Sequence, residues 1–199
     1  MDYLNGMTTI IDMIRHGTPE GGNRYRGHNI NDPLSEEGWQ QMWTAVEDYP
    51  VWDAVISSPM QRCLSFAQAY AESHRLDVEI IENLKEVGFG EWEGKSSREI
   101  LAENPDVIKN FYHDPVTHKP AGAEALDQFQ KRIQSAIEYT LEKYIGKQVL
   151  LVAHAGVIRA AVTAMIQAVP ASMYRISIGN AAIVRIKDDG IRPPTVMIY

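Results

Sequence analysis

Short apolar runs separated by helix-length segments constrain this chain more than any other feature. The runs at 10–14 and 149–153 are nearly continuous in apolar residues, and 51–56 has a similar pattern. Runs of this length suit strands that are buried on both faces of a largely parallel sheet. A late pair at 182–186 and 195–198 predicts an antiparallel edge to the same sheet.

Helical periodicity occupies the segments between these runs. Apolar residues recur at helical spacing from Trp39 to Val46, after Ser35, a favoured N-cap residue. Further helices are expected to open at Pro59, to run from about 124 to about 144, and to run from 156 to about 167. Alternating strands and helices predict an α/β fold, a three-layer α/β/α sandwich with a mostly parallel central sheet and a late antiparallel edge strand.

The length of the chain fits one domain. At 199 residues a single hydrophobic core can still enclose the whole sequence, so one domain over 1–199 is expected. Residues 1–7 are expected to be disordered, and Met7 is an alternative start that would make 1–6 an extension. Mobile loops are expected at Gly21-Gly22 and at 104–122.

Composition and charge exclude several kinds of partner. The formal net charge of −7 argues against nucleic acid or an anionic membrane surface, since both require a basic face. No stretch reaches the ~18 apolar residues that a membrane span requires. The single cysteine, Cys63, cannot form an internal disulfide, which favours a reducing cytoplasm. A cytoplasmic protein is therefore expected, one that binds anions only through a local basic pocket.

Cationic and imidazole side chains follow three of the predicted strands directly. Arg15-His16-Gly17 follows the first strand, 57–62 follows the second and ends on Arg62, and His154-Ala155-Gly156 follows the strand at 149–153. Ligands of such sheets bind beyond the carboxyl ends of the strands. These segments are therefore expected to converge on one rim.

Each of these residues alone has a simpler explanation. A single histidine after a strand more often packs or caps, and a single arginine is usually solvated or ion-paired. Their convergence in an acidic chain is different, because a phosphate pocket accounts for all of them. Guanidinium groups bind phosphate oxygens bidentately, imidazole acts as nucleophile or donor, and Gly17 and Gly156 let backbone N–H groups approach an anion.

Four segments in order carry a resemblance to a known family. They are Arg15-His16-Gly17, Ser57-Ser58-Pro59 with Arg62, the stretch from Leu84-Lys85-Glu86 to Gly90-Glu91-Trp92-Glu93-Gly94, and His154-Ala155-Gly156. Together they resemble the histidine phosphatase, or phosphoglycerate mutase-like, superfamily over roughly residues 10–186. The compact length and the segments around Arg26-Gly27 and Asp32 are most similar to the small alpha-ribazole phosphatases of that superfamily.

The resemblance implies catalytic roles for matching residues. His16 would accept the phosphoryl group as nucleophile. Arg15, Arg62 and His154 would hold the phosphoryl oxygens and stabilise the charge of the transition state. Glu86 would protonate the leaving alkoxide and then deprotonate the attacking water, although a glutamate beside a lysine is commonly only solvated.

Other residues are implied as substrate contacts. Thr18 offers a hydroxyl after the first motif, and Asn23 lies one residue later than the phosphate-contacting asparagine of the family. Arg26 and Gly27 match the loop that shapes the substrate mouth in the small phosphatases, and Ala155 belongs to the late motif.

Two further elements have a structural alternative. The segment Gly122-Ala123-Glu124-Ala125 resembles the glycine-glycine-glutamate-serine element that opens the long helix in relatives. It either contacts substrate or simply starts the helix, with Glu124 complementing the helix dipole. Trp92 and its flanking glycines are expected to fix the loop that carries Glu86 rather than to touch substrate.

Neither a metal nor another cofactor is expected. The six histidines show no clustered ligand spacing, and arginines beside His16 would repel a cation. The implied function is hydrolysis of a small-molecule phosphomonoester through phosphohistidine on His16, most similar to the alpha-ribazole 5'-phosphate phosphatase of cobalamin biosynthesis. The alternatives are a broad-specificity sugar or nucleotide phosphatase, a phosphoglycerate mutase and a non-catalytic phosphate-binding module. The sequence also leaves a homodimer open.

Overall fold

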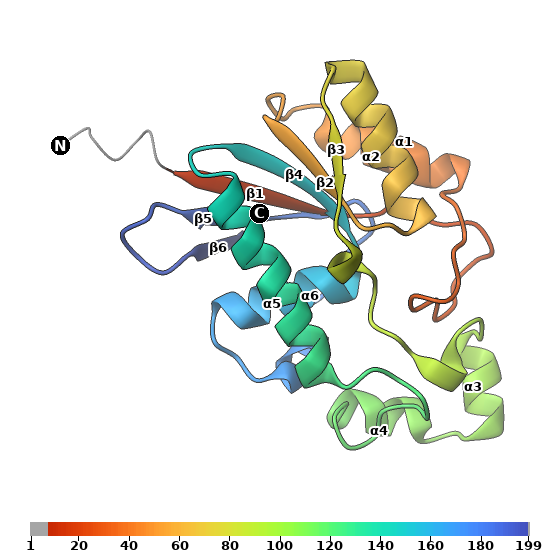
Figure 1. Ribbon diagram of the computed structural model, residues 1–199. Coiled ribbons are helices and arrows are strands. Elements are labelled where there is room, and N and C mark those ends of the chain that lie inside the picture. The colour runs from red at the N-terminus through yellow and green to blue at the C-terminus, as the bar shows by residue number, and fades with distance from the viewer. Residues whose placement is uncertain (1–7, 199) are drawn as a thin grey trace.

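A computed structural model describes residues 8–198. Its central element is a six-stranded sheet with strand order β3-β2-β4-β1-β5-β6 (Figure 1). The expected disorder of 1–7 and the alternative start at Met7 lie outside the described residues.

The sheet is parallel except at one edge. Its strands are β1 (Thr9–Arg15), β2 (Ala54–Ser57), β3 (Val78–Ile80), β4 (Gln148–Ala153), β5 (Ile183–Asp188) and β6 (Thr195–Ile198). Strands β1 to β4 pair in parallel, whereas β5 pairs antiparallel with β1 and β6 antiparallel with β5. Side chains along β1 and β4 are buried almost throughout, as expected for strands covered on both faces. The predicted fold class is confirmed.

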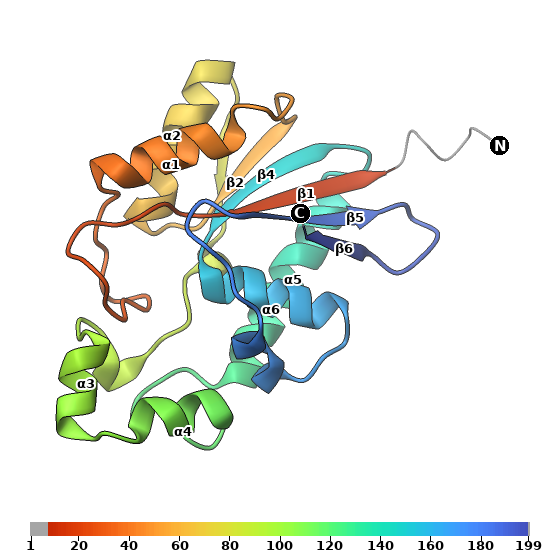
Figure 2. The same cartoon turned by 180° about the vertical axis from the view of Figure 1, so that it is seen from behind.

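Long helices cover both faces of the sheet. They are α1 (Glu36–Val46), α2 (Gln61–His74), α5 (Leu126–Lys143) and α6 (Ala155–Met165). Helices α1 and α2 lie on one face, and α5 and α6 on the other (Figures 1 and 2). Ser35 is the N-cap of α1, and its hydroxyl accepts the Gly38 N–H at 3.1 Å. Helix α2 opens at Gln61 rather than Pro59, because Met60 is still extended.

Two strand expectations need correction. The strand predicted at 51–56 begins only at Ala54, since Val51 is exposed and the indole of Trp52 turns inward to donate to buried Asp12 at 2.8 Å. Strand β3 was not predicted from the sequence. It is three residues long, contains Glu79 and lies at the sheet edge, so it has neither the length nor the apolar run that marks a buried strand.

The segment predicted as a mobile loop, 104–122, contains a helix. Helix α4 (Val107–His113) follows α3 (Ser97–Glu103), and both lie apart from the helical layers of the sandwich (Figure 1). Each is too short to show clear periodicity. For α3 the sequence nevertheless contains a helix-start signal, because the side chains of Ser96 and Glu99 form a capping box at its beginning.

Aromatic packing joins this helical pair to the rest of the molecule. Trp92, on η2 (Gly90–Trp92), is buried against Phe111 of α4, with ring centroids 5.2 Å apart. Tyr25 from the loop after β1 and Tyr174 from η3 (Pro170–Arg175) pack on the same cluster. Trp92 therefore has the structural position that its motif predicts.

The helices within residues 8–198 differ from those that cross a bilayer. None of them combines the length and the apolar character that such a span demands.

Candidate active site

The register of the central strands places two histidines beside each other. In the parallel pairing of β1 with β4, Arg15 lies opposite Ala153, so His16 and His154 both lie just beyond the sheet. The His16 N–H donates to the Ala153 carbonyl at 2.9 Å, and the two imidazole centroids are 5.3 Å apart. Ser58, after β2, donates its N–H to the Val152 carbonyl at 3.0 Å. The strand ends therefore lie together at one rim.

The imidazole of His16 is held as a neutral base. Its Nδ1 lies 2.7 Å from the Gly17 carbonyl oxygen, which can only accept, so Nδ1 carries the proton and Nε2 keeps its lone pair. Burial, and then the charge of Arg62, set the pKa of His16 well below its ordinary value of 6.5. His16 lines a cavity of about 400 Å³. An unprotonated Nε2 in such a residue can act as a nucleophile.

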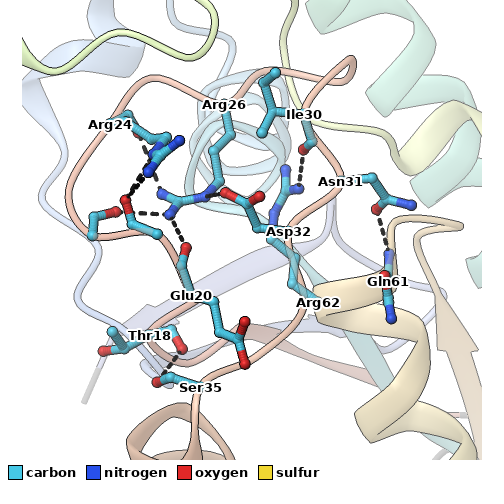
Figure 3. Close-up of polar contacts among 12 residues, drawn as sticks. Thr18, Glu20, Arg24, Arg26, Ile30, Asn31, Asp32, Ser35, Gln61 and Arg62 are labelled. Atoms are coloured by element: carbon cyan, nitrogen blue, oxygen red, sulfur yellow. Dashed lines mark hydrogen bonds and ion pairs between the residues drawn. The ribbon is translucent and has the colours of Figure 1, made fainter.

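Four arginines line the same cavity, and two of them, Arg15 and Arg62, were predicted to hold the phosphoryl oxygens. Arg15 donates from Nη1 to the Ile178 carbonyl at 2.7 Å. Arg62 donates to the carbonyls of Gly27 and Ile30, each at 2.9 Å. Figure 3 shows the bond to Ile30. The Nε atoms of both arginines are buried without an acceptor. Backbone carbonyls thus orient both groups, and an oxyanion in the cavity would supply further acceptors.

A carboxylate completes this set. Glu86 accepts the Val87 N–H at 2.9 Å and the Gly156 N–H, at the start of α6, at 3.2 Å. A Cβ on Gly156 would lie 2.2 Å from the carboxylate, so only glycine allows this approach. The Gly156 N–H was expected to approach a bound anion, and here its acceptor is the carboxyl group of Glu86. Burial lowers the pKa of Arg15, and the charge of Glu86 opposes that shift.

The loop after β1 is organised around Arg26 (Figure 3). Its Nε pairs with Asp32 at 2.9 Å, and its Nη2 donates to the carbonyls of Glu20 at 2.5 Å and Gly22 at 2.7 Å. Burial lowers the pKa of Arg26, and the bond to Asp32 opposes this effect. Arg26 lines the cavity, but most of its donors already hold the loop in place.

Asn180 lines the cavity although sequence reasoning did not identify it. It donates from Nδ2 to the Thr18 hydroxyl at 2.9 Å, and Thr18 donates to Gln41 through its hydroxyl and its N–H. The sequence does contain a pattern that could have identified Asn180. Asn180 precedes a strand antiparallel to β1, and the beginning of such a strand lies at the carboxyl end of β1.

Most of the predicted site residues line this one cavity. Those that do are Arg15, His16, Thr18, Asn23, Arg26, Gly27, Arg62 and Glu86, together with Asn180 and the aromatic side chains of Tyr25 and Phe89. His154 and Ala155 are not among the lining residues. His154 is fully buried beside His16 and lies 2.8 Å, through Nε2, from the Ser58 hydroxyl. Glu124 also lies elsewhere, in an ion pair with Arg132.

Within residues 8–198, histidine, cysteine, aspartate and glutamate do not gather in groups of three or more that could hold an ion.

Comparisons with known proteins give the chain a family context. The histidine phosphatase superfamily (branch 1) matches residues 11–197. A bifunctional protein from Mycobacterium tuberculosis is 30% identical over 183 residues, 89% of this chain and 50% of the relative, so the chain spans about half the length of that relative.

Two shorter relatives match more of their own length. Putative phosphoserine phosphatase 2 from Hydrogenobacter thermophilus is 29% identical over 190 residues, 94% of this chain and 93% of the relative. The adenosylcobalamin/alpha-ribazole phosphatase of Escherichia coli is 27% identical over 151 residues, 73% of each. Among solved structures, mycobacterial glucosyl-3-phosphoglycerate phosphatase in complex with VO3 matches with a TM-score of 0.81 and 26% identity, over 96% of this chain and 98% of that chain.

The buried histidines predict a loss of stability in acid. Burial, followed by the charge of Arg62, also sets the pKa of His154 well below 6.5. Below pH 6.5 the unfolded chain therefore binds protons that the folded chain does not, and the free energy of unfolding falls as pH falls, by up to about 1.4 kcal/mol per pH unit for each group.

Urea unfolding between pH 7.5 and pH 5 measures this loss. The His154→Asn variant should lose less stability over that interval than the wild type. His118→Asn, at an exposed histidine, is the control and should keep the wild-type slope. Equal slopes for all three proteins would contradict a neutral buried His154.

Proposed function

The chain belongs to branch 1 of the histidine phosphatase superfamily, and we propose that it is a phosphoric monoester hydrolase that uses His16 as its nucleophile. The observation that carries the proposal is the composition of the cavity. A neutral imidazole, two oriented guanidinium groups and one carboxylate line it together. These are the parts that transfer of a phosphoryl group to nitrogen requires.

In the first step, Nε2 of His16 attacks the phosphorus atom of the bound monoester. The N–P bond forms as the bond between phosphorus and the leaving oxygen breaks. Glu86, which takes a proton from the monoanionic phosphomonoester as it binds, passes that proton to the leaving oxygen. Arg15 and Arg62 stabilise the charge on the phosphoryl oxygens. Their Nε–H groups, buried without an acceptor, support this role. We assign His154 to the same oxygens because its ring neighbours that of His16.

In the second step, water attacks the phosphorus atom of phospho-His16. Glu86, now ionised, removes the proton from the water as the N–P bond breaks, and phosphate leaves with that proton as its monoanion. The enzyme returns to its starting protonation state, so one carboxyl group serves first as acid and then as base. No metal ion takes part in either step of this scheme.

The substrate proposed is alpha-ribazole 5'-phosphate. The ring of Tyr25 and that of Phe89 line the cavity and pack edge to face at 5.1 Å, so they offer an aromatic wall to a flat benzimidazole. The similarity to the Escherichia coli alpha-ribazole phosphatase supports the same substrate. A small phosphate such as phosphoserine is the second candidate, favoured by the relative from Hydrogenobacter thermophilus that is matched over 93% of its length.

The presence of both Glu86 and His16 in the cavity argues against a module that only binds phosphate, because such a module needs no carboxylate for proton transfer. A cytoplasmic location stays a prediction from the single buried cysteine, Cys63, and a homodimer stays untested.

Removal of the nucleophile is the direct test of the chemistry. Rapid quench of the wild type with ³²P-labelled substrate should trap an acid-labile, base-stable adduct on His16. His16→Ala should abolish the adduct and lower turnover on the order of 10⁶-fold, the scale seen when a covalent nucleophile is lost. His118→Ala, at an exposed histidine outside the cavity, is the matched control. An active His16→Ala variant would rule out the mechanism.

The role of Glu86 is tested through the leaving group. An alkyl alkoxide needs a proton to leave, whereas para-nitrophenolate barely does. Glu86→Gln should therefore slow single-turnover phosphorylation by an alkyl phosphate by about 10²-fold or more, with a much smaller effect on para-nitrophenyl phosphate. Phospho-His16 should also accumulate, because its hydrolysis needs a base. Glu91→Gln, at an exposed glutamate, serves as control. Equal losses for both leaving groups would remove Glu86 from the role of acid.

The substrate is tested by comparing kcat/KM across a panel in EDTA. We expect alpha-ribazole 5'-phosphate to exceed phosphoserine, 3-phosphoglycerate and simple sugar phosphates by at least about tenfold, the effect of a stacking contact of roughly 1.4 kcal/mol. A clear preference for phosphoserine would transfer the assignment to the second candidate. Full loss of activity in EDTA, restored by a divalent metal, would contradict the metal-free scheme.

A further inference from the structure

We infer that the ion pair of Arg132 with Glu124 is a positioning device for Glu86, and that it sets how efficiently this carboxylate exchanges protons with the leaving group. The inference rests on the proposed function, in which Glu86 is the general acid. Neither residue lines the cavity, so both would act only through the loop that carries Glu86.

The guanidinium group of Arg132 is fixed in two ways. It lies on α5, and its Nε and Nη2 donate to the two carboxylate oxygens of Glu124 at 2.7 and 2.9 Å. Its Cζ also lies 4.5 Å from the ring centroid of buried Phe129. A bidentate pair stacked on an aromatic ring has little freedom to rotate, so the remaining donors keep a fixed direction.

Those remaining donors all bind the backbone around Glu86. Nη1 donates to the carbonyls of Asn83 at 2.5 Å and Lys85 at 2.8 Å, and Nη2 donates to the carbonyl of Glu86 at 3.2 Å. A guanidinium group has five N–H donors, and every one of them has an acceptor here. Lysine, with three donors on one atom, cannot reproduce this pattern.

Glu124 holds the other side of Glu86. Its carboxylate accepts the Gly88 N–H at 3.2 Å, and its own N–H donates to the Gly88 carbonyl at 2.9 Å. The backbone is therefore tied before Glu86 by Arg132 and after it by Glu124, and the two ties are joined by the ion pair. The alternative left open by the sequence, a simple helix start, does not explain these contacts.

The position of the carboxylate depends on this backbone. Glu86 accepts the N–H of its own neighbour, Val87, and a Gly156 N–H on a different element. A shift of the loop would lengthen the bond to Gly156 and turn the carboxylate away from Arg15. Displacement of a catalytic group by about 1 Å can cost roughly 10²-fold in rate.

An ordinary structural ion pair would behave differently. Its loss would lower stability and reduce all rates alike, or reduce none. A positioning pair should instead affect the step in which the proton moves. The effect should follow the basicity of the leaving oxygen, because only a poor leaving group depends on the acid.

The experiment compares Arg132→Met, Arg132→Lys and Glu124→Gln with the wild type in single-turnover phosphorylation of His16. We expect Arg132→Met to slow an alkyl phosphate about 10- to 100-fold and para-nitrophenyl phosphate less than about threefold, with KM for both nearly unchanged. Arg132→Lys should give no rescue. Glu124→Gln, which still accepts the Gly88 N–H, should fall between the wild type and Arg132→Met.

A matched variant and a second measurement separate the outcomes. Arg192→Met breaks another arginine–carboxylate pair, at the β5–β6 turn, in which Nε and Nη2 both donate to one oxygen of Asp189, and it should leave both rates unchanged. Hydrogen exchange should rise at 83–89 in Arg132→Met and not across the sheet. Equal losses for both leaving groups, or wild-type exchange at 83–89, would overturn the positioning role while leaving the phosphatase assignment intact. A wild type that forms no phospho-His16 would instead overturn the proposed function, and this inference with it.

Discussion

The parallel pairing of β1 with β4 is the constraint on which the site depends. With Arg15 opposite Ala153, the next residue of each strand is a histidine, and the hydrogen bond from the His16 N–H to Ala153 fixes their separation. A one-residue slip of this register would turn every side chain of one strand to the opposite face. The apolar side chains of both strands are buried, so the core that stabilises the sheet also keeps the two imidazoles together.

Cationic groups gathered in a partly buried cavity repel one another, and an acidic chain does not remove that local cost. The structure offsets it with backbone oxygens: carbonyls hold Arg15, Arg26 and Arg62, and Asp32 neutralises Arg26. Burial keeps His16 and His154 uncharged, which avoids two further positive charges. The positive field that an anion meets therefore comes mainly from fixed guanidinium groups, and the imidazole keeps the lone pair that a nucleophile needs.

Those parts of the site that follow strands could be predicted from the sequence, because buried parallel strands show long apolar runs and their ends meet at one edge. His16, Arg62 and His154 were identified in this way. Contacts between a side chain and a segment far away in the sequence could not be predicted. In the sequence Arg132 is one cation within the long predicted helix, and only the folded chain brings it against the loop of Glu86. Short helices such as α3 and α4 were missed because two turns are too few for a clear period.

The site therefore divides into two parts with different origins. The proposed nucleophile and phosphate-binding groups follow strands, whereas the proposed general acid and the cavity wall of Tyr25, Phe89 and Asn180 come from connecting segments. Loops tolerate substitution better than a buried sheet does. The proposed phosphoryl chemistry can thus stay constant while the leaving group that the cavity accepts changes, which fits one relative named as a phosphoserine phosphatase and another named as an alpha-ribazole phosphatase, at 29% and 27% identity. Glu86 belongs to both parts: it lies on a loop, yet in the proposed mechanism its carboxylate must keep its place in the cavity that His16 also lines. The guanidinium group of Arg132 on α5 meets both requirements. Its five hydrogen bonds hold Glu124 and the backbone of the Glu86 loop, while the rest of the cavity wall stays free to vary.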